Sequence, residues 1–392
     1  GQGGNQHIAA GAYMRTVDNV NYVFGTTPPR YPSTIIAQMG NPNLKWETVE
    51  AIDFGIDLTM LNNRLNITAD IYQKTSHDML YPKQGLLIAG NPAWMGAITQ
   101  NIGSMRARGW ELAIDWNDQV NKDFRYSVGL QLSGTRNKGI LFTGDGPLYT
   151  GGGMNESIIR NDDNALISRF YGYECLGIFQ NWTQVYAHTN EHGDLIQRDA
   201  QPGDLIFADR NHDGKLDESD KTFLGNPYPD LTLGLNISLW YKNFDLTANF
   251  YGTFGNDIFN LQRSRYSGGS GQNVYRGTLE KAWHFEGQDT DIPRLSYNDL
   301  NQNYSRVSSF YVEDGSYFRC KLFTLGYTLP KSIMKDYKLR FYVSAQNLFT
   351  LTKYKGMDPE VPFLNGGAIE TGIDNNNYPN PRTFLVGIDF NF

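Results

Sequence analysis

The sequence predicts an all-β chain that forms part of an antiparallel transmembrane β-barrel. Apolar and polar residues alternate over strand-length segments, short turns alternate with long polar loops, and helical periodicity is nearly absent. No segment reaches the roughly eighteen consecutive apolar residues of a membrane helix. The net charge of -7, without a block of Lys or Arg, argues against a nucleic-acid-binding protein, which needs a clustered cationic surface.

Each predicted strand carries an apolar residue at every second position, as one apolar face of a β-strand requires. In chain order these positions are Ile52, Phe54, Ile56 and Leu58; Leu65, Ile67, Ala69 and Ile71; Trp110, Leu112, Ile114 and Trp116; Tyr126, Val128, Leu130 and Leu132; Leu233, Leu235, Ile237 and Leu239; Phe244, Leu246, Ala248 and Phe250; Phe323, Leu325 and Tyr327; Leu339, Phe341, Val343 and Ala345; and Phe384, Val386, Ile388, Phe390 and Phe392. A soluble sandwich hides such a face in its core and a membrane barrel turns it toward lipid, so alternation alone does not separate the two.

Four further features favour the membrane barrel. The strands run to about ten residues, the length that a tilted membrane strand needs. Tight turns and long linkers alternate, with turns at 61–64, 117–123, 241–243 and 330–337 and linkers near 76–100, 136–164, 255–316 and 349–381. Aromatic residues lie near strand ends, as in the interfacial girdles of a barrel: Trp46, Trp110, Trp116, Trp240 and Tyr241. The sequence stops at Phe392, and a C-terminal aromatic on the lipid face is the signal that outer-membrane assembly machinery reads.

The strand count raises two questions. We count roughly ten to twelve strands, which as an open arc would expose an edge to lipid, so we expect an upstream piece to supply the missing strands. The run Leu166–Phe179 also has a strand-like pattern. With it, strand directions alternate correctly only if one more strand precedes Leu231, and Leu205–Phe207 is the sole candidate in the sequence.

The sharpest chemical motif runs from Asp209 to Asp220, within a loop spanning residues 203–230. Oxygen-bearing side chains at its positions 1, 3, 5, 9 and 12 and a glycine at position 6 predict a Ca²⁺ site, because Ca²⁺ takes about six to eight oxygen ligands. The predicted ligands are Asp209, Asn211, Asp213, Asp217 and Asp220, with Lys215 ligating through its carbonyl oxygen. Asp instead of Glu at position 12 weakens or shrinks the site, which leaves Mg²⁺ as an alternative ion. A turn rich in Asn, Asp and Gly that binds no ion is the competing interpretation.

Catalytic motifs are missing from the sequence, which has no nucleophile elbow, HExxH, P-loop or GxGxxG segment. We therefore predict that the chain is not an enzyme. His188 and His192 have the spacing of metal ligands, but their segment is rich in turn formers and has no third ligand nearby, which favours a solvated loop. Aromatic-rich loops at 144–182 and 255–316 could stack sugars or pack against a partner, and the sequence selects no substrate-binding residue among them.

A series of short segments adds a family resemblance to these patterns. They are Gly4-Asn5-Gln6; Asn41–Thr48; the turn Asn62–Leu65; Gly203-Asp204 through the calcium-like loop to Thr222–Asp230; Phe244–Leu246; Tyr251-Gly252 to Gly255–Asp257; Val312–Arg319; Thr324–Pro330; Ala345–Thr350; Tyr354–Glu360; and Tyr378–Arg382. In this order they resemble the barrel of SusC/RagA-type TonB-dependent transporters, and they span essentially the whole chain.

The resemblance implies an active importer in the outer membrane of Gram-negative bacteria, chiefly Bacteroidetes. Such transporters combine a barrel of about twenty-two strands with an N-terminal plug. They import oligosaccharides or oligopeptides with energy delivered by the TonB complex, and a SusD-like surface lipoprotein closes the extracellular mouth, in some cases within a dimeric SusC2D2-type assembly. We expect residues 1–392 to be the C-terminal part of the barrel, embedded in lipid, with the plug and the first half of the barrel in a cleaved or separate segment.

Two other interpretations remain open at this point. A calcium-stabilised surface adhesin or glycan-binding β domain without transport would need its apolar strand faces buried. A secreted glycoside hydrolase would need two carboxylates about 5–10 Å apart in a cleft. The transporter interpretation requires apolar strand faces that point outward to lipid and polar faces that enclose a wet lumen.

Overall fold

The computed structural model describes residues 15–23, 30–38, 41, 43–83, 98–142, 146–266, 273–335, 337–361 and 369–392. The segment Gly4-Asn5-Gln6, which contributes to the family resemblance, lies outside these residues. Within them, no helix has both the length and the apolar character that a membrane span needs.

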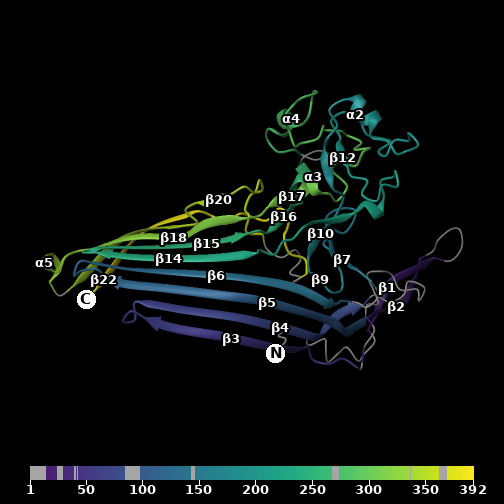
Figure 1. Cartoon of the computed structure of the whole chain (residues 1–392). Helices are drawn as coiled ribbons and strands as arrows, with labels where there is room; N and C mark the ends of the chain where they lie inside the picture. Colours follow the sequence, from purple (N-terminus) through teal and green to yellow (C-terminus); the bar gives the residue numbers. More distant parts are fainter. Residues whose placement is uncertain are drawn as a thin grey trace.

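Long antiparallel strands lie side by side in an 11-stranded sheet (Figure 1). Its order is β22-β19-β18-β15-β14-β6-β5-β4-β3, with β20 paired to β18 and β9 paired to β6. The bounds are β3 Thr48–Met60, β4 Leu65–Lys83, β5 Ile98–Gln119, β6 Phe124–Leu141, β9 Ala165–Leu166, β14 Leu231–Tyr241, β15 Phe244–Phe254, β18 Tyr317–Thr328, β19 Lys338–Gln346, β20 Thr350–Thr352 and β22 Thr383–Asn391. Two further strands, β1 (Arg15–Val23) and β2 (Arg30–Gln38), form a sheet of their own. We call the 11-stranded sheet the wall.

The predicted tight turns are confirmed, and they lie at the same end of the wall as the C-terminus and the short helix α5 (Lys331–Met334) (Figure 1). In the turn between β3 and β4, Leu61, Asn62 and Asn63 all have positive φ values. Asparagine tolerates this left-handed region better than most residues, because its short polar side chain hydrogen-bonds locally. The turn residues therefore bring β4 back directly alongside β3.

Several wall strands are longer than predicted. β4 and β5 have 19 and 22 residues, whereas about 9–11 tilted residues cross a bilayer. Because the tight turns fix one end of β4 and β5, the excess residues extend the wall at the opposite end (Figure 1).

One face of the wall is a continuous apolar surface, because the strand register aligns the alternating apolar residues. Leu239 lies opposite Leu246, which lies opposite Leu325, and the row continues through Val343 to Val386. Phe54 and Val386 are 69% and 84% exposed, and none of the apolar positions predicted on these strands belongs to a buried apolar cluster of the described residues. An adhesin or other soluble β domain would bury this face, whereas a membrane barrel presents it to lipid.

The opposite face of the wall is polar. Thr247, Thr324 and Ser344 follow one another across three strands. Nearer the tight turns, the guanidinium of Arg340 lies 2.7 Å from Asp245 and 2.8 Å from Asp389. This face is the wet side that a lumen requires.

The long connections 142–230, 255–316 and 347–382 pack together at the far end of the wall, and we call their described residues the loop module (Figure 1). Its strands are β7 Leu148–Thr150, β8 Ile159–Asn161, β10 Arg169–Gly172, β11 Cys175–Ile178, β12 Leu205–Phe207, β13 Thr222–Gly225, β16 Asp257–Asn260, β17 Val312–Asp314 and β21 Ile373–Asp374. Its helices are α2 Trp182–Ala187, α3 Gln262–Tyr266, α4 Thr278–Lys281, η2 Glu218–Asp220 and η3 Ser309–Tyr311. A buried cluster joins all three connections, with Phe170 and Phe207 from the first, Phe259 and Tyr311 from the second and Ile373 from the third.

The expectation that Leu166–Phe179 is a wall strand is wrong. This segment divides into pieces of three short strands, β9, β10 and β11, of which only the two-residue β9 touches the wall. Leu205–Phe207 is a strand, as expected, but it pairs with β11 inside the loop module. Because 142–230 is one long connection, strand directions alternate correctly without an additional strand.

Candidate functional site

The residues predicted to bind calcium lie together in the loop module, in the connection between β12 and β13. Backbone amides already hold the carboxylates in place: Gly214 N donates to Asp209 Oδ2 (2.9 Å), Lys215 N donates to Asp213 Oδ1 (2.9 Å), and Ser219 N donates to Asp217 Oδ1 (2.9 Å). These local bonds fix the conformation of the loop and the orientation of three of its carboxylates.

Position 6 of the loop requires glycine for two reasons. Gly214 has a φ of +79°, in the left-handed region that disfavours a Cβ atom. A Cβ atom at Gly214 would also lie 2.2 Å from Cβ of Asn190 on the neighbouring segment. The sharp bend of the loop and its contact with Asn190 both depend on this residue.

Asp220, at position 12, closes the loop. Its carboxylate is fully buried and accepts Arg210 N at 2.9 Å and Asp217 N at 2.8 Å. Each carboxylate oxygen has more than one acceptor site, so these bonds are compatible with ligation. Asp217 and Asp220 form a capping box at the start of η2, in which each side chain accepts a backbone amide of the other end. Hydrogen bonds from Ser219 lower the pKa of the Asp217 carboxyl group.

One carboxylate oxygen of the loop has the surroundings expected of a cation ligand. Oδ1 of Asp209 is buried and has no hydrogen-bond partner, although burial of an unpaired carboxylate oxygen is costly. Within the described residues, no group of three or more His, Cys, Asp and Glu side chains is arranged to hold a metal ion. The amide oxygen of Asn211 and the carbonyl oxygen of Lys215 would therefore have to complete the site.

The two histidines with metal-ligand spacing lie beside this loop, around a cavity of about 730 Å³ that Asp209 and Asp213 also line. The ring of His188 packs edge-on against Phe179, with ring centroids 5.6 Å apart. Burial lowers the pKa of His188 despite the nearby Asp209. The expectation of a fully solvated loop is thus only partly met, because His188 is half-buried.

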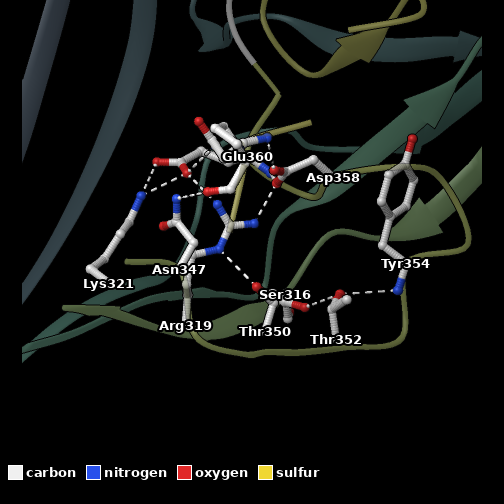
Figure 2. A network of polar contacts seen from close by, with 11 residues as sticks. Ser316, Arg319, Lys321, Asn347, Thr350, Thr352, Tyr354, Asp358 and Glu360 are labelled. Atoms are coloured by element: carbon white, nitrogen blue, oxygen red, sulfur yellow. Dashed lines mark hydrogen bonds and ion pairs between the residues drawn. The ribbon is translucent and has the colours of Figure 1, made fainter. Parts of the chain in front are cut away.

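A second polar cluster lies where β18 enters the loop module (Figure 2). Arg319 donates from Nη1 to Glu360 Oε2 (2.8 Å), from Nη2 to Asp358 Oδ1 (2.5 Å) and from Nε to Thr350 Oγ1 (2.8 Å). Lys321 Nζ donates to both carboxylate oxygens of Glu360 at 2.7 Å. The Arg319 and Asp358 side chains are only 3% and 7% exposed, whereas those of Lys321 and Glu360 are 33% and 36% exposed. The network is therefore electrically balanced and buried on its Arg319–Asp358 side.

A β-bulge decides which face of the wall this cluster occupies. Leu322 pairs with Asn249 and Cys320 pairs with Phe250, so Lys321 is an extra residue without a partner on β15. The bulge reverses the alternation along β18. Arg319, opposite Tyr251, therefore shares the polar face, although Phe323 four residues later faces lipid.

The loop module has a polar core of its own. Asp204 belongs to the Gly203-Asp204 segment that contributes to the family resemblance. It is fully buried and forms an ion pair with Arg294 at 2.6 Å. Asn303 Nδ2 donates to the same carboxylate at 2.9 Å. Sequence reasoning found Gly203-Asp204 as a motif but gave no sign of its partners, which lie about ninety residues further along the chain.

Residues 10–348 match the family model described as TonB dependent receptor-like, beta-barrel. The chain belongs to this family. It is 31% identical over its whole length to TonB-dependent receptor P3 of Formosa agariphila, of which it covers 38%, and 29% identical over 97% of its length to TonB-dependent receptor SusC of Bacteroides thetaiotaomicron, of which it covers 35%. The predicted SusC/RagA-type relationship is confirmed, and with it the location in the outer membrane.

The fold agrees with solved structures. The structure titled "Structure of the RagAB peptide transporter" superposes with a TM-score of 0.73 at 24% identity, over 96% of this chain and 38% of that one. The structure titled "Structure of the RagAB peptide importer in the 'open-open' state" superposes with a TM-score of 0.72, over 97% of this chain. The chain therefore spans little more than a third of the proteins that it matches, and it forms part of a barrel.

Proposed function

We propose that this chain forms the C-terminal wall of an outer-membrane importer that takes up oligosaccharides or oligopeptides with energy from the TonB complex. The observation that carries the proposal is the two-sided wall, because an apolar face that crosses nine strands with its large side chains exposed or half-buried and a polar face opposite suit a lipid-embedded conduit. The chain covers 38% and 35% of two longer relatives, and we assign the plug and the remaining strands of the barrel to the additional length of the whole transporter.

A SusD-like lipoprotein lid is the proposed partner. The loop module supports this assignment, because it is a folded surface with its own core at the end of the wall that faces away from the tight turns. Exposed aromatic residues on this module, among them Trp182 and Tyr186 on α2, suit contact with a lid or with sugar rings. The name of one relative, SusC, and the RagAB titles support this kind of partner. We also propose that two transporter–lid pairs form a dimer.

The test is uptake by intact cells that carry the whole transporter. Labelled oligosaccharide and oligopeptide mixtures are supplied separately, with and without a protonophore that collapses the inner-membrane gradient. We expect one class of label to enter the cell and the protonophore to stop its entry. Surface retention of label that is insensitive to the protonophore would instead support the adhesin interpretation.

We also propose that the Asp209–Asp220 loop binds Ca²⁺, with Mg²⁺ as a weaker alternative. The buried, unpartnered Oδ1 of Asp209 supports this proposal, together with the spacing of the other oxygen ligands. Bound Ca²⁺ would supply a counter-charge for the carboxylates of the loop. The bound ion would then have a structural role: it would rigidify the loop, which lines the adjacent cavity.

A further inference from the structure

Residues 353–361, which follow β20, fold against the polar face of the wall, and we call them the latch segment. Thr350 and Thr352 pair with Arg319 and Tyr317 of β18, so the chain leaves β20 beside these two residues. The segment then returns to Arg319, whose guanidinium binds two of its carboxylates (Figure 2). Because the bulge places Arg319 on the polar face, the latch segment lies on the lumenal side of the wall.

The charges in this cluster are balanced, and the Arg319–Asp358 pair at its centre is buried. Arg319 and Lys321 face Asp358 and Glu360, so two positive side chains meet two negative ones. Removing Arg319 or Asp358 leaves a buried charge without its partner, which is far more costly than replacing both residues together. Displacement of the latch segment would have the same effect, since Arg319 would remain behind on β18.

Contacts with other residues of the loop module, of which the latch segment is a part, hold the segment at further points. Tyr354 Oη donates to Asp374 Oδ2 at 2.6 Å, and Lys355 N donates to Glu313 Oε2 at 2.8 Å. Asn380 N donates to Asp358 Oδ2 at 2.9 Å. The segment is therefore tied to β18, to the 255–316 connection and to later residues of its own connection.

We infer that the latch segment is a fixed constriction at the extracellular mouth of the lumen, positioned by Arg319, and that it stays in place while cargo passes. The inferred position of the latch segment does not depend on what the protein does. The inference that the segment stays in place while cargo passes rests on the proposed import function. The inference makes Arg319 a positioning residue: it contacts the segment that narrows the conduit and need not contact the cargo.

Proteolysis of the whole transporter on intact cells tests the position of the segment. Lys353 and Lys355 are exposed trypsin sites inside it, and a tethered segment resists cleavage because it must open first. We expect Arg319→Met to accelerate cleavage at these lysines about a hundredfold. Arg340→Met is the matched control, since it removes another arginine paired with two carboxylates on the same face, and it should leave cleavage at both lysines unchanged.

A second variant covers the case in which Arg319→Met fails to reach the outer membrane. Asp358→Asn combined with Glu360→Gln removes both negative charges with little change in volume, and it should release the segment in the same way. Surface labelling establishes that each variant is present at the wild-type level. Rapid cleavage of the wild-type segment, or equal cleavage of wild type and the latch variants, would overturn the inference.

Cross-linking tests whether the segment moves. Lys321→Cys and Glu360→Cys together allow a short bis-methanethiosulfonate bridge between wall and segment, which a reductant removes. We expect bridged and unbridged protein to import label at the same rate, with the single-cysteine variants as controls. Loss of import on bridging that the reductant restores would show a moving gate and overturn the inference. Absence of import before bridging would count against the proposed function and would leave the trypsin result to decide the position of the segment.

Discussion

Arg319 shows how a buried charge is tolerated next to a membrane. Its guanidinium reaches two carboxylates and a hydroxyl group, which is the planar, multiple hydrogen bonding for which arginine is suited. Burial alone would raise the pKa of Asp358, but hydrogen bonds from Arg319 and from the amides of Glu360 and Asn380 lower it below its ordinary value. The pairing therefore favours the charged form of Asp358 in the folded state.

Acid should loosen the latch segment. A carboxyl group with a lowered folded-state pKa stabilises the fold above its unfolded pKa of about 4 and loses this contribution as the pH falls through the folded value. We expect hydrogen exchange in residues 353–361, corrected for the intrinsic rate, to increase below about pH 4. Asp358→Asn should remove this pH dependence and show fast exchange at all pH values. A wild-type segment that is equally protected at pH 7 and pH 3 would contradict the assignment.

Asp209 gives the calcium proposal its sharpest test. If its buried Oδ1 ligates an ion, Asp209→Asn should weaken Ca²⁺ binding about tenfold or more and remove most of the thermal stabilisation that Ca²⁺ gives over a chelator. Calorimetry on the detergent-extracted transporter measures both effects.

Asp194→Asn is the matched control for this measurement. It makes the same change of charge at an exposed position near the loop but outside it. Equal Ca²⁺ affinity of the wild type and the Asp209 variant would show that the loop is an ordinary turn. Repeating the titration with Mg²⁺ identifies the preferred ion.

Among the elements, β18 depends on a single additional residue. The bulge at Lys321 lets one strand carry lipid-facing Phe323, Leu325 and Tyr327 and lumen-facing Arg319 without a break in pairing. Bulges are a common means of redirecting a side chain at the rim of a barrel. The stacked rings of Phe250 and Phe318, 5.4 Å apart, continue the apolar face beyond the bulge.

Deleting Lys321 should therefore damage assembly more than mutating it. The deletion restores regular alternation and turns Arg319 toward lipid, where an arginine costs up to about 2–4 kcal/mol depending on depth. Lys321→Ala keeps the bulge and loses one exposed ion pair, so it should assemble normally. Heat-modifiable migration of the outer-membrane fraction on gels distinguishes folded from unfolded barrel. Normal assembly of the deletion variant would refute the role assigned to the bulge.

For the whole molecule, the apolar face of the wall is the property on which localisation depends. Leu235 lies within the apolar face, between Leu130 and Phe250, whereas its neighbour Asn236 points to the lumen. We expect Leu235→Lys to destabilise the barrel by about 2–4 kcal/mol and to reduce its level in the outer membrane, because a lysine near the bilayer centre is poorly tolerated. Asn236→Lys should be accepted. Equal levels of the two variants would mean that the faces are assigned the wrong way round.

Strand alternation and turn chemistry made much of the wall predictable, because both are local. The turn Asn62-Asn63 and the alternation on either side of it define β3 and β4 without reference to any other part of the chain. The bulge leaves a signal in the sequence, because apolar residues occupy even positions at Phe318 and Cys320 and odd positions from Phe323 onward.

The loop module and the latch segment were not predictable in the same way. The strand-like run Leu166–Phe179 was misassigned because short strands in a loop alternate just as wall strands do. The partners of Arg319 and Asp204 lie about 40 and 90 residues away along the chain, and no local pattern links them. The calcium-like loop was recognisable because its oxygen ligands are close together in sequence.

The common core of the three long connections limits how such a surface can diversify. Phe170, Phe259 and Ile373 come from different connections and are all fully buried in one cluster. Transplanting one connection into a related barrel would therefore leave its apolar side chains without their packing partners. A successful graft would have to carry all three connections together. New specificity is more readily acquired by exchanging outward-pointing side chains, such as Trp182 and Tyr186, on an otherwise unchanged scaffold.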